Sequence, residues 1–165
     1  MRDRAGARVA LAGVALLLAA GCTVAVSGLR PESPALGTDA TEFVAVESLQ
    51  PVLRWEAFPT GRDYQLRRAQ NIRYDLQIFR AEEDYPGALI YRRKDLPERW
   101  HQVEERLTPA TRYFWTVRAR FELGGEPRVT EWGCILPAEP TLREMAYRTP
   151  RTPSPFYYRF RTPAP

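Results

Sequence analysis

The stretch Leu107-Thr-Pro-Ala-Thr-Arg-Tyr-Phe-Trp-Thr-Val-Arg-Ala-Arg-Phe121 decides the fold of this chain. From Tyr113 onward every second side chain is apolar, and the side chains between them are polar except for Phe114. The residues that share the apolar face are Tyr113, Trp115, Val117, Ala119 and Phe121. A period of two over this length predicts a β-strand with one buried face.

Shorter stretches of the same kind recur between turn signals, and they predict an all-β domain. Residues 51–59 alternate around Leu53 and Trp55, and residues 72–80 alternate around Tyr74 and Leu76. Shorter strands are expected at residues 43–46, 88–92, 100–104 and 156–161. The 15 prolines of the chain also favour strands and turns over helices.

The N-terminal residues 1–21 have the pattern of a secretory signal peptide. A basic start is followed by about 12 apolar residues, which is too short for a bilayer span of roughly 20. The segment Leu18-Ala-Ala-Gly-Cys22 resembles the bacterial lipobox, with Ala19 where Leu is usual. This resemblance implies export through the Sec pathway, cleavage after Gly21 and acylation of Cys22, which would anchor the protein in a lipid bilayer.

Thr23, the second residue of the mature chain, implies the outer membrane, facing the periplasm. The alternative is an ordinary signal peptide, with cleavage at an Ala-x-Ala-like site and an incidental cysteine at position 22. Residues 22–41 are rich in Ser, Thr, Gly, Pro and Ala, so we expect a lipidated N-terminus followed by a flexible tether.

Residues 42–163 resemble a fibronectin type III domain. The resemblance is carried by Leu53-x-Trp55, by Tyr74-x-Leu76-x-Ile78, by the alternating stretch after Pro109 and by the closing Phe160-Arg-Thr-Pro163. It implies an immunoglobulin-like antiparallel β-sandwich in which the Tyr113 hydroxyl bonds back to the upstream backbone, as in a tyrosine corner.

The domain is longer than such sandwiches, and the excess lies in a proline-rich insertion at residues 134–155. Thr141-Leu-Arg-Glu144 fits a capping box, so a helix of about two turns is expected inside the insertion. Cys134 lies at its start and is expected to be a buried or half-buried thiol.

The charge does not indicate a nucleic-acid partner. The formal net charge is +4, but the arginines alternate with acidic residues instead of forming one basic stripe. Lys94 is the only lysine among 24 basic residues.

The sequence offers no constellation for catalysis. His101 is the only histidine, and neither a metal-ligand spacing nor a nucleophile or phosphate-binding motif is present. We therefore expect a protein that is not an enzyme and that has no catalytic residues, no metal site and no cofactor.

Aromatic residues expected to point outward are the best candidates for a binding site. Phe79 and Phe114 are expected on the outer face of neighbouring strands, with Arg118 and Arg120 beside them, and Trp132 adjoins the insertion. Aromatic and arginine side chains are typical of protein interfaces. An arginine–aromatic ladder that merely supports a solvated sheet is the alternative.

These patterns together predict a monomeric, non-catalytic lipoprotein. Its function would be to bind another envelope protein, or to take part in an assembly of the cell envelope. The alternative function is a carbohydrate or small-ligand binding module that uses exposed aromatic residues.

Overall fold

The structure is a computed structural model that describes residues 27–39, 41–61, 63–135, 154 and 156–165. These residues form nine strands and one turn of 3₁₀ helix. The elements are β1 (Pro31–Ser33), β2 (Val44–Ala45), β3 (Val52–Trp55), η1 (Tyr64–Leu66), β4 (Gln70–Glu82), β5 (Tyr85–Leu96), β6 (Trp100–Gln102), β7 (Arg112–Leu123), β8 (Glu126–Val129) and β9 (Tyr158–Arg161).

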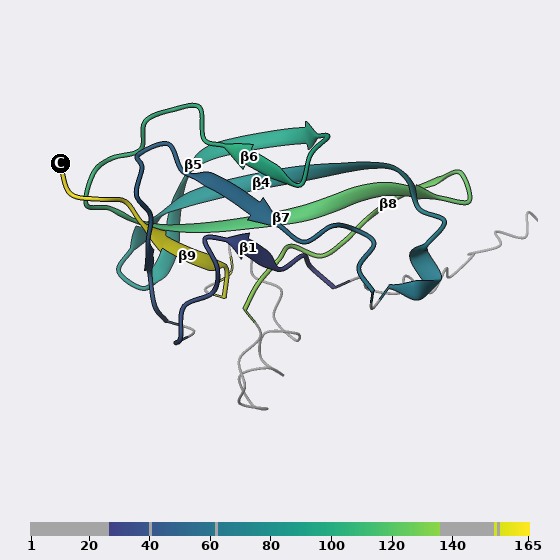
Figure 1. Ribbon diagram of the computed structural model, residues 1–165, viewed down its shortest axis with the longest axis horizontal. Helices are drawn as coiled ribbons and strands as arrows, with labels where there is room; N and C mark the ends of the chain where they lie inside the picture. The colour runs from purple at the N-terminus through teal and green to yellow at the C-terminus, as the bar shows by residue number, and fades with distance from the viewer. Residues whose placement is uncertain (1–26, 40, 62, 136–153, 155) are drawn as a thin grey trace, which may run out of the picture.

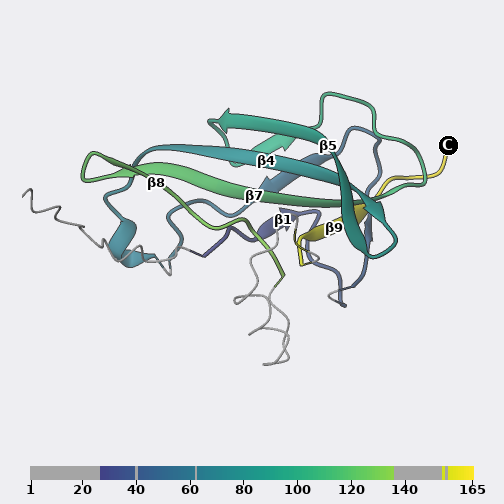
Figure 2. The ribbon, with the colours of Figure 1, turned by 180° about the vertical axis from the view of Figure 1, so that it is seen from behind.

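The strands form two sheets that pack face to face as an all-β sandwich (Figure 1). One sheet has three strands in the order β1-β3-β6. The other has the order β2-β9-β7-β4-β5, and β8 pairs with the far end of β7. The long strands β4 and β7 run the length of the molecule, as the view from behind also shows (Figure 2). The predicted fold class, an all-β sandwich, is therefore correct.

The main core lies between the two sheets, and the alternation of β7 supplies its centre. Tyr113 is 1% exposed and Trp115 is fully buried, as the period of two predicts. Leu53 and Trp55 reach the same core from β3 in the opposite sheet. The edge-to-face contact between Trp55 and Tyr74, with ring centroids 5.5 Å apart, joins the two sheets.

Tyr113 makes the hydrogen bond expected of a tyrosine at the start of this strand. The backbone N–H of Thr108 donates to its hydroxyl at 3.0 Å, and its ring stacks on Phe160 with centroids 5.3 Å apart. The side chain thereby ties the chain before β7 to β7 and β9.

The N-terminal part of the domain begins earlier than the sequence suggested. β1 lies within the expected tether 22–41 and pairs antiparallel with β3, while Leu29 is 1% exposed. From Leu29 onward the chain is therefore part of the sandwich. The reason is that a single apolar residue followed by a short edge strand leaves almost no periodic pattern in the sequence.

The strand expected at residues 88–92 is also longer than predicted. β5 has 12 residues and continues through Arg92 and Arg93, which pair with Gln77 and Leu76. The basic run does not end the strand. One edge of β5 pairs with β4, and the other edge, which has no neighbouring strand among the described residues, is where such charges discourage pairing.

β8 and β9 pair with the two ends of the same edge of β7, so together they occupy the place of one strand that is divided in two. β7 turns through Gly124-Gly125, with φ values of 62° and 82°, into β8, a geometry that glycine favours in a two-residue hairpin. The chain after β8 stays beside β7 as far as Gly133, whose N–H donates to Val117 at 2.8 Å, and β9 then resumes the pairing with β7 at Tyr158. The expected insertion thus interrupts this strand.

Candidate functional site

The outer face of the large sheet carries the predicted interaction residues, but two of them are covered. Phe79 and Phe114 lie on the outer face of the neighbouring strands β4 and β7, as expected, but at 5% and 0% exposure they are not available to a partner, so their assignment to an exposed surface is wrong. Tyr157 packs on Phe79 at 5.8 Å between ring centroids, and Phe43 contacts Phe114 at 5.3 Å. The reason is that segments distant in sequence fold over this end of the sheet and form a second apolar cluster.

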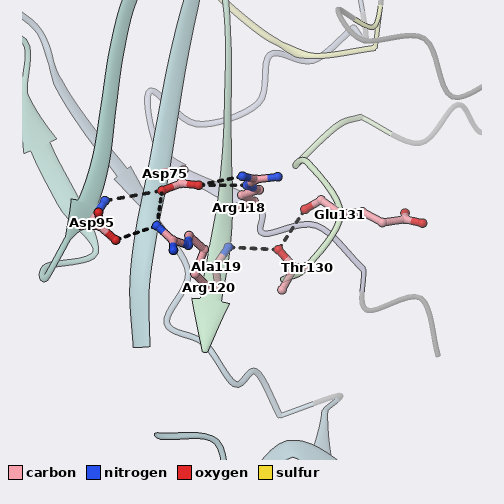
Figure 3. Close-up of polar contacts among 7 residues, drawn as sticks. All are labelled: Asp75, Asp95, Arg118, Ala119, Arg120, Thr130 and Glu131. Atoms are coloured by element: carbon pink, nitrogen blue, oxygen red, sulfur yellow. Dashed lines mark hydrogen bonds and ion pairs between the residues drawn. The ribbon is translucent and has the colours of Figure 1, made fainter. Parts of the chain in front are cut away.

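Further along the same face, Asp75 organises a network of charges (Figure 3). Its side chain is 3% exposed, and its Oδ2 accepts hydrogen bonds from Arg118 Nε at 3.0 Å and Nη2 at 2.9 Å. Arg120 lies 3.9 Å from the other oxygen and pairs with Asp95 at 2.7 Å. Because a buried carboxylate requires compensation, this network fixes the positions of both arginines.

Trp132 completes the arrangement from the chain between β8 and the insertion. The guanidinium of Arg118 lies 4.5 Å from the centre of its indole ring. Two threonines hold this segment against β7: Thr130 exchanges hydrogen bonds with the backbone of Ala119, and Thr116 donates to the Gly133 carbonyl at 2.7 Å. The indole of Trp132 is therefore held in place, and it remains partly exposed.

A cleft of about 240 Å³ opens beside this stacked pair. It lies over β4, between β5 and the Trp132 segment, and its lining residues are Asp75, Gln77, Arg92, Lys94, Arg118 and Trp132. Three of the six side chains are cationic and one is anionic. The structure thus brings Arg118 and Trp132 of the predicted surface together, whereas Arg120 faces a second hollow of about 280 Å³ near the β7–β8 hairpin.

Sequence reasoning missed Asp75, Gln77, Arg92 and Lys94 as members of this site. The signal was present in part, because the period of two places Asp75 and Gln77 on the same face as Arg118. The contribution of Arg92 and Lys94 depends on the register between β4 and β5, which the sequence does not specify.

Cys134 and Arg159 border the covered apolar cluster. The Cys134 thiol is free and half-buried, as predicted, and burial raises its pKa above the usual value. Burial also lowers the pKa of Arg159, which lies over the Phe43 and Phe114 rings at 5.3 and 5.1 Å. A thiol with a raised pKa is mainly protonated at neutral pH and is a weak nucleophile.

The potentially reactive side chains do not converge. His101 lies on β6 of the small sheet, where its Nε2 is 2.7 Å from the Tyr91 hydroxyl, while Cys134 packs on the outer face of the large sheet. Among the described residues no group of three His, Cys, Asp or Glu side chains is placed to hold a metal ion. No helix in that part of the chain is long and apolar enough to cross a membrane.

Three predicted features lie outside the described residues, namely the signal peptide at residues 1–21, the lipidation site Cys22 and the short helix expected at the capping box of residues 141–144. No protein family model, no curated protein and no solved structure significantly matches this chain.

Proposed function

We propose that this protein is a non-catalytic lipoprotein of the bacterial cell envelope whose sandwich domain binds another envelope protein. The observation that carries the proposal is the Arg118–Trp132 pair, held by the buried Asp75 and flanked on one sheet face by Arg92 and Lys94, which form no ion pair with a described residue. A preorganised arginine and an aromatic ring are typical of the residues that dominate protein interfaces. The resemblance to fibronectin type III domains supports the same reading.

A pull-down from solubilised envelope tests this function. We expect Trp132→Ala to lose the partner that the wild-type protein retains. Trp100→Ala is the matched control, because Trp100 is 45% exposed but lies on β6 of the opposite sheet. Equal retention by both variants, with unchanged thermal unfolding, contradicts the assignment of binding to this face.

The anchoring part of the proposal rests on the lipobox-like segment that ends at Cys22. We expect Cys22→Ser to abolish incorporation of labelled palmitate and to move the protein from the membrane fraction, where the outer membrane is expected, to the soluble periplasmic fraction. Stable anchoring requires acyl chains, each buried CH₂ contributing about 0.8 kcal/mol. If the Cys22→Ser variant stays in the membrane fraction, the proposal that acylation of Cys22 anchors the protein is wrong.

The alternative of a carbohydrate-binding module has weaker support. Phe79 and Phe114 are buried, and Arg118 covers one face of the Trp132 indole, so these aromatic rings offer little flat surface for a sugar to stack on.

A further inference from the structure

The chemistry of the cleft beside Trp132 indicates what kind of group its partner presents. Arg92 and Lys94 project from β5 at the rim, and neither makes an ion pair or side-chain hydrogen bond with the described residues. Arg118 is the third cation, and its Nε and Nη2 are already directed at Asp75. Three cations against one carboxylate leave an excess of positive charge that favours an anion.

Gln77, which lines the cleft beneath these cations, gives a second and independent indication. It is 8% exposed, and its side-chain Oε1 is buried without a hydrogen-bond partner among the described residues. A buried amide without a partner is costly, whereas an amide both donates and accepts once a ligand is present. A ligand that carries both an anionic group and a neighbouring peptide group satisfies the cations and Gln77 together.

The position of the cleft at the edge of the sheet adds the third element. β5 is the end strand of the large sheet, so one edge of its backbone has no neighbouring strand among the described residues. An extended peptide segment can therefore reach the outer face of the sheet across β5 without meeting another described strand. Its backbone then lies over Gln77, and one of its side chains lies between Arg92 and Lys94.

We propose that the cleft binds an acidic side chain, Asp or Glu, of an extended segment of the partner protein. The carboxylate lies between Arg92 and Lys94, and a peptide group of the same segment hydrogen-bonds with Gln77. This inference rests on the proposed function and specifies the chemical class of the partner.

The test measures fluorescence anisotropy of a labelled octaglutamate peptide with the full-length protein in detergent at an ionic strength of about 0.15 M, where the Debye length is about 8 Å. We expect the double variant Arg92→Ala/Lys94→Ala to raise the Kd about tenfold, because two direct charge contacts are lost. The matched control is Arg67→Ala/Arg68→Ala, which also removes two exposed positive charges but lies in the segment after η1. We expect this control to change the Kd less than about twofold, since distant exposed charges are screened.

Gln77→Met is the second variant, because it removes the amide while leaving charge and size nearly unchanged. We expect it to raise the Kd about threefold, the effect of one hydrogen bond. Its thermal unfolding reports separately on folding, and we expect no loss of stability, because Gln77 Oε1 accepts no hydrogen bond from a described residue.

Three outcomes would overturn the inference. One is an equal loss of affinity in the double variant and its control, which would mean attraction by net charge alone. Another is no binding of octaglutamate at all. The last is displacement of the peptide by glucuronate or inorganic phosphate at lower concentrations than by N-acetyl-glutamate amide, which would assign the cleft to an acidic sugar or a phosphate. The pull-down with Trp132→Ala tests the proposed function separately, because its result does not depend on whether the cleft binds an acidic side chain.

Discussion

Tyr113 connects the start of β7 to the chain before it through a single hydroxyl group, which accepts from the Thr108 N–H at 3.0 Å. We expect Tyr113→Phe to lower the free energy of unfolding by about 1–1.5 kcal/mol, since the partly buried Thr108 N–H loses its acceptor. Urea unfolding measures this change. Tyr85→Phe is the control, because Tyr85 is 61% exposed, and a change within about 0.5 kcal/mol is expected there. Equal effects of the two substitutions would contradict the role of the Tyr113 hydroxyl.

His101 gives the domain a pH dependence near neutrality. Burial, the largest effect, lowers its pKa below the usual value, with Arg93 acting in the same direction and Glu104 opposing it. The unfolded chain therefore takes up the proton first as the pH falls through about 6.5, and stability decreases below that pH.

We expect urea unfolding between pH 7.5 and pH 5.5 to show this decrease, and His101→Gln to remove most of it. Glu104 does not interfere in this range: its carboxyl, hydrogen-bonded to Arg93, has a lowered pKa, and the stability it contributes is lost only at more acidic pH. An unchanged slope in His101→Gln would show that another group titrates.

At the residue scale, the sequence predicts the burial of a side chain correctly where the alternation of its own strand determines which face it occupies and nothing else covers it. The alternation of β7 was sufficient to place Tyr113 and Trp115 in the core. It was insufficient for Phe79 and Phe114, because Tyr157 and Phe43, which cover them, come from segments far away in the sequence.

At the scale of elements, the divided last strand is the main departure from the predicted domain. The two ends of the insertion meet, since the Ile135 N–H donates to the Phe156 carbonyl at 2.7 Å. This is one of the two backbone hydrogen bonds between the residues that flank a two-residue hairpin loop, so we expect Asn-Gly to be able to replace residues 136–155.

We expect this replacement to leave the domain folded and to raise the free energy of unfolding by up to about 2 kcal/mol, because a shorter loop costs less entropy to close. Thermal and urea unfolding measure the effect. A large loss of stability would contradict it and would show that the insertion contributes to the packing of the sandwich.

The crossing of the N-terminal segment over the divided strand depends on Gly133. A Cβ at this position would overlap the Leu29 carbonyl oxygen and the Tyr158 ring, and a Cβ at Gly28 would lie only 2.6 Å from the Gly133 Cα. We expect Gly133→Ala to lower the free energy of unfolding by about 1–3 kcal/mol through overpacking. Gly61→Ala is the control, because a Cβ there meets nothing within 4 Å. Similar stabilities of the two variants would refute the close approach.

Element boundaries were predictable where a period of two extends over many residues, as in β4 and β7. Three strands have only two to four residues each, namely β1, β2 and β8. Such strands are too short to show an alternation of polar and apolar residues, so only their pairing with a neighbouring strand defines them. The proline-rich composition of residues 134–155 located the break between β8 and β9, whereas the pairing of both strands with β7 follows from contacts across the sheet.

At the scale of the whole molecule, the N-terminal segment holds the two sheets together. β1 belongs to the small sheet and β2 to the large one, so the chain between them crosses from one layer to the other. Leu29 is buried in the main core, and its carbonyl accepts a hydrogen bond from the Tyr158 hydroxyl.

We expect a variant that begins at Ser27 to be as stable as one that begins at Cys22. A variant that begins at Ala35 should lose about 2–3 kcal/mol, because it lacks buried Leu29 and the pairing of β1. Differential scanning calorimetry of both purified variants compares them. If the shorter variant is equally stable, the first strand does not contribute to the fold.

The parallel pairing of β2 with β9 has a mechanical consequence. Val44 lies beside Phe160, Ala45 lies beside Arg161, and the Val46 N–H donates to the Arg161 carbonyl at 3.0 Å. When tension draws the two ends of the domain apart, parallel strands slide past each other, and their hydrogen bonds are loaded in shear together instead of opening one by one. We therefore expect the domain to unfold slowly when a stretching force is applied to its two ends.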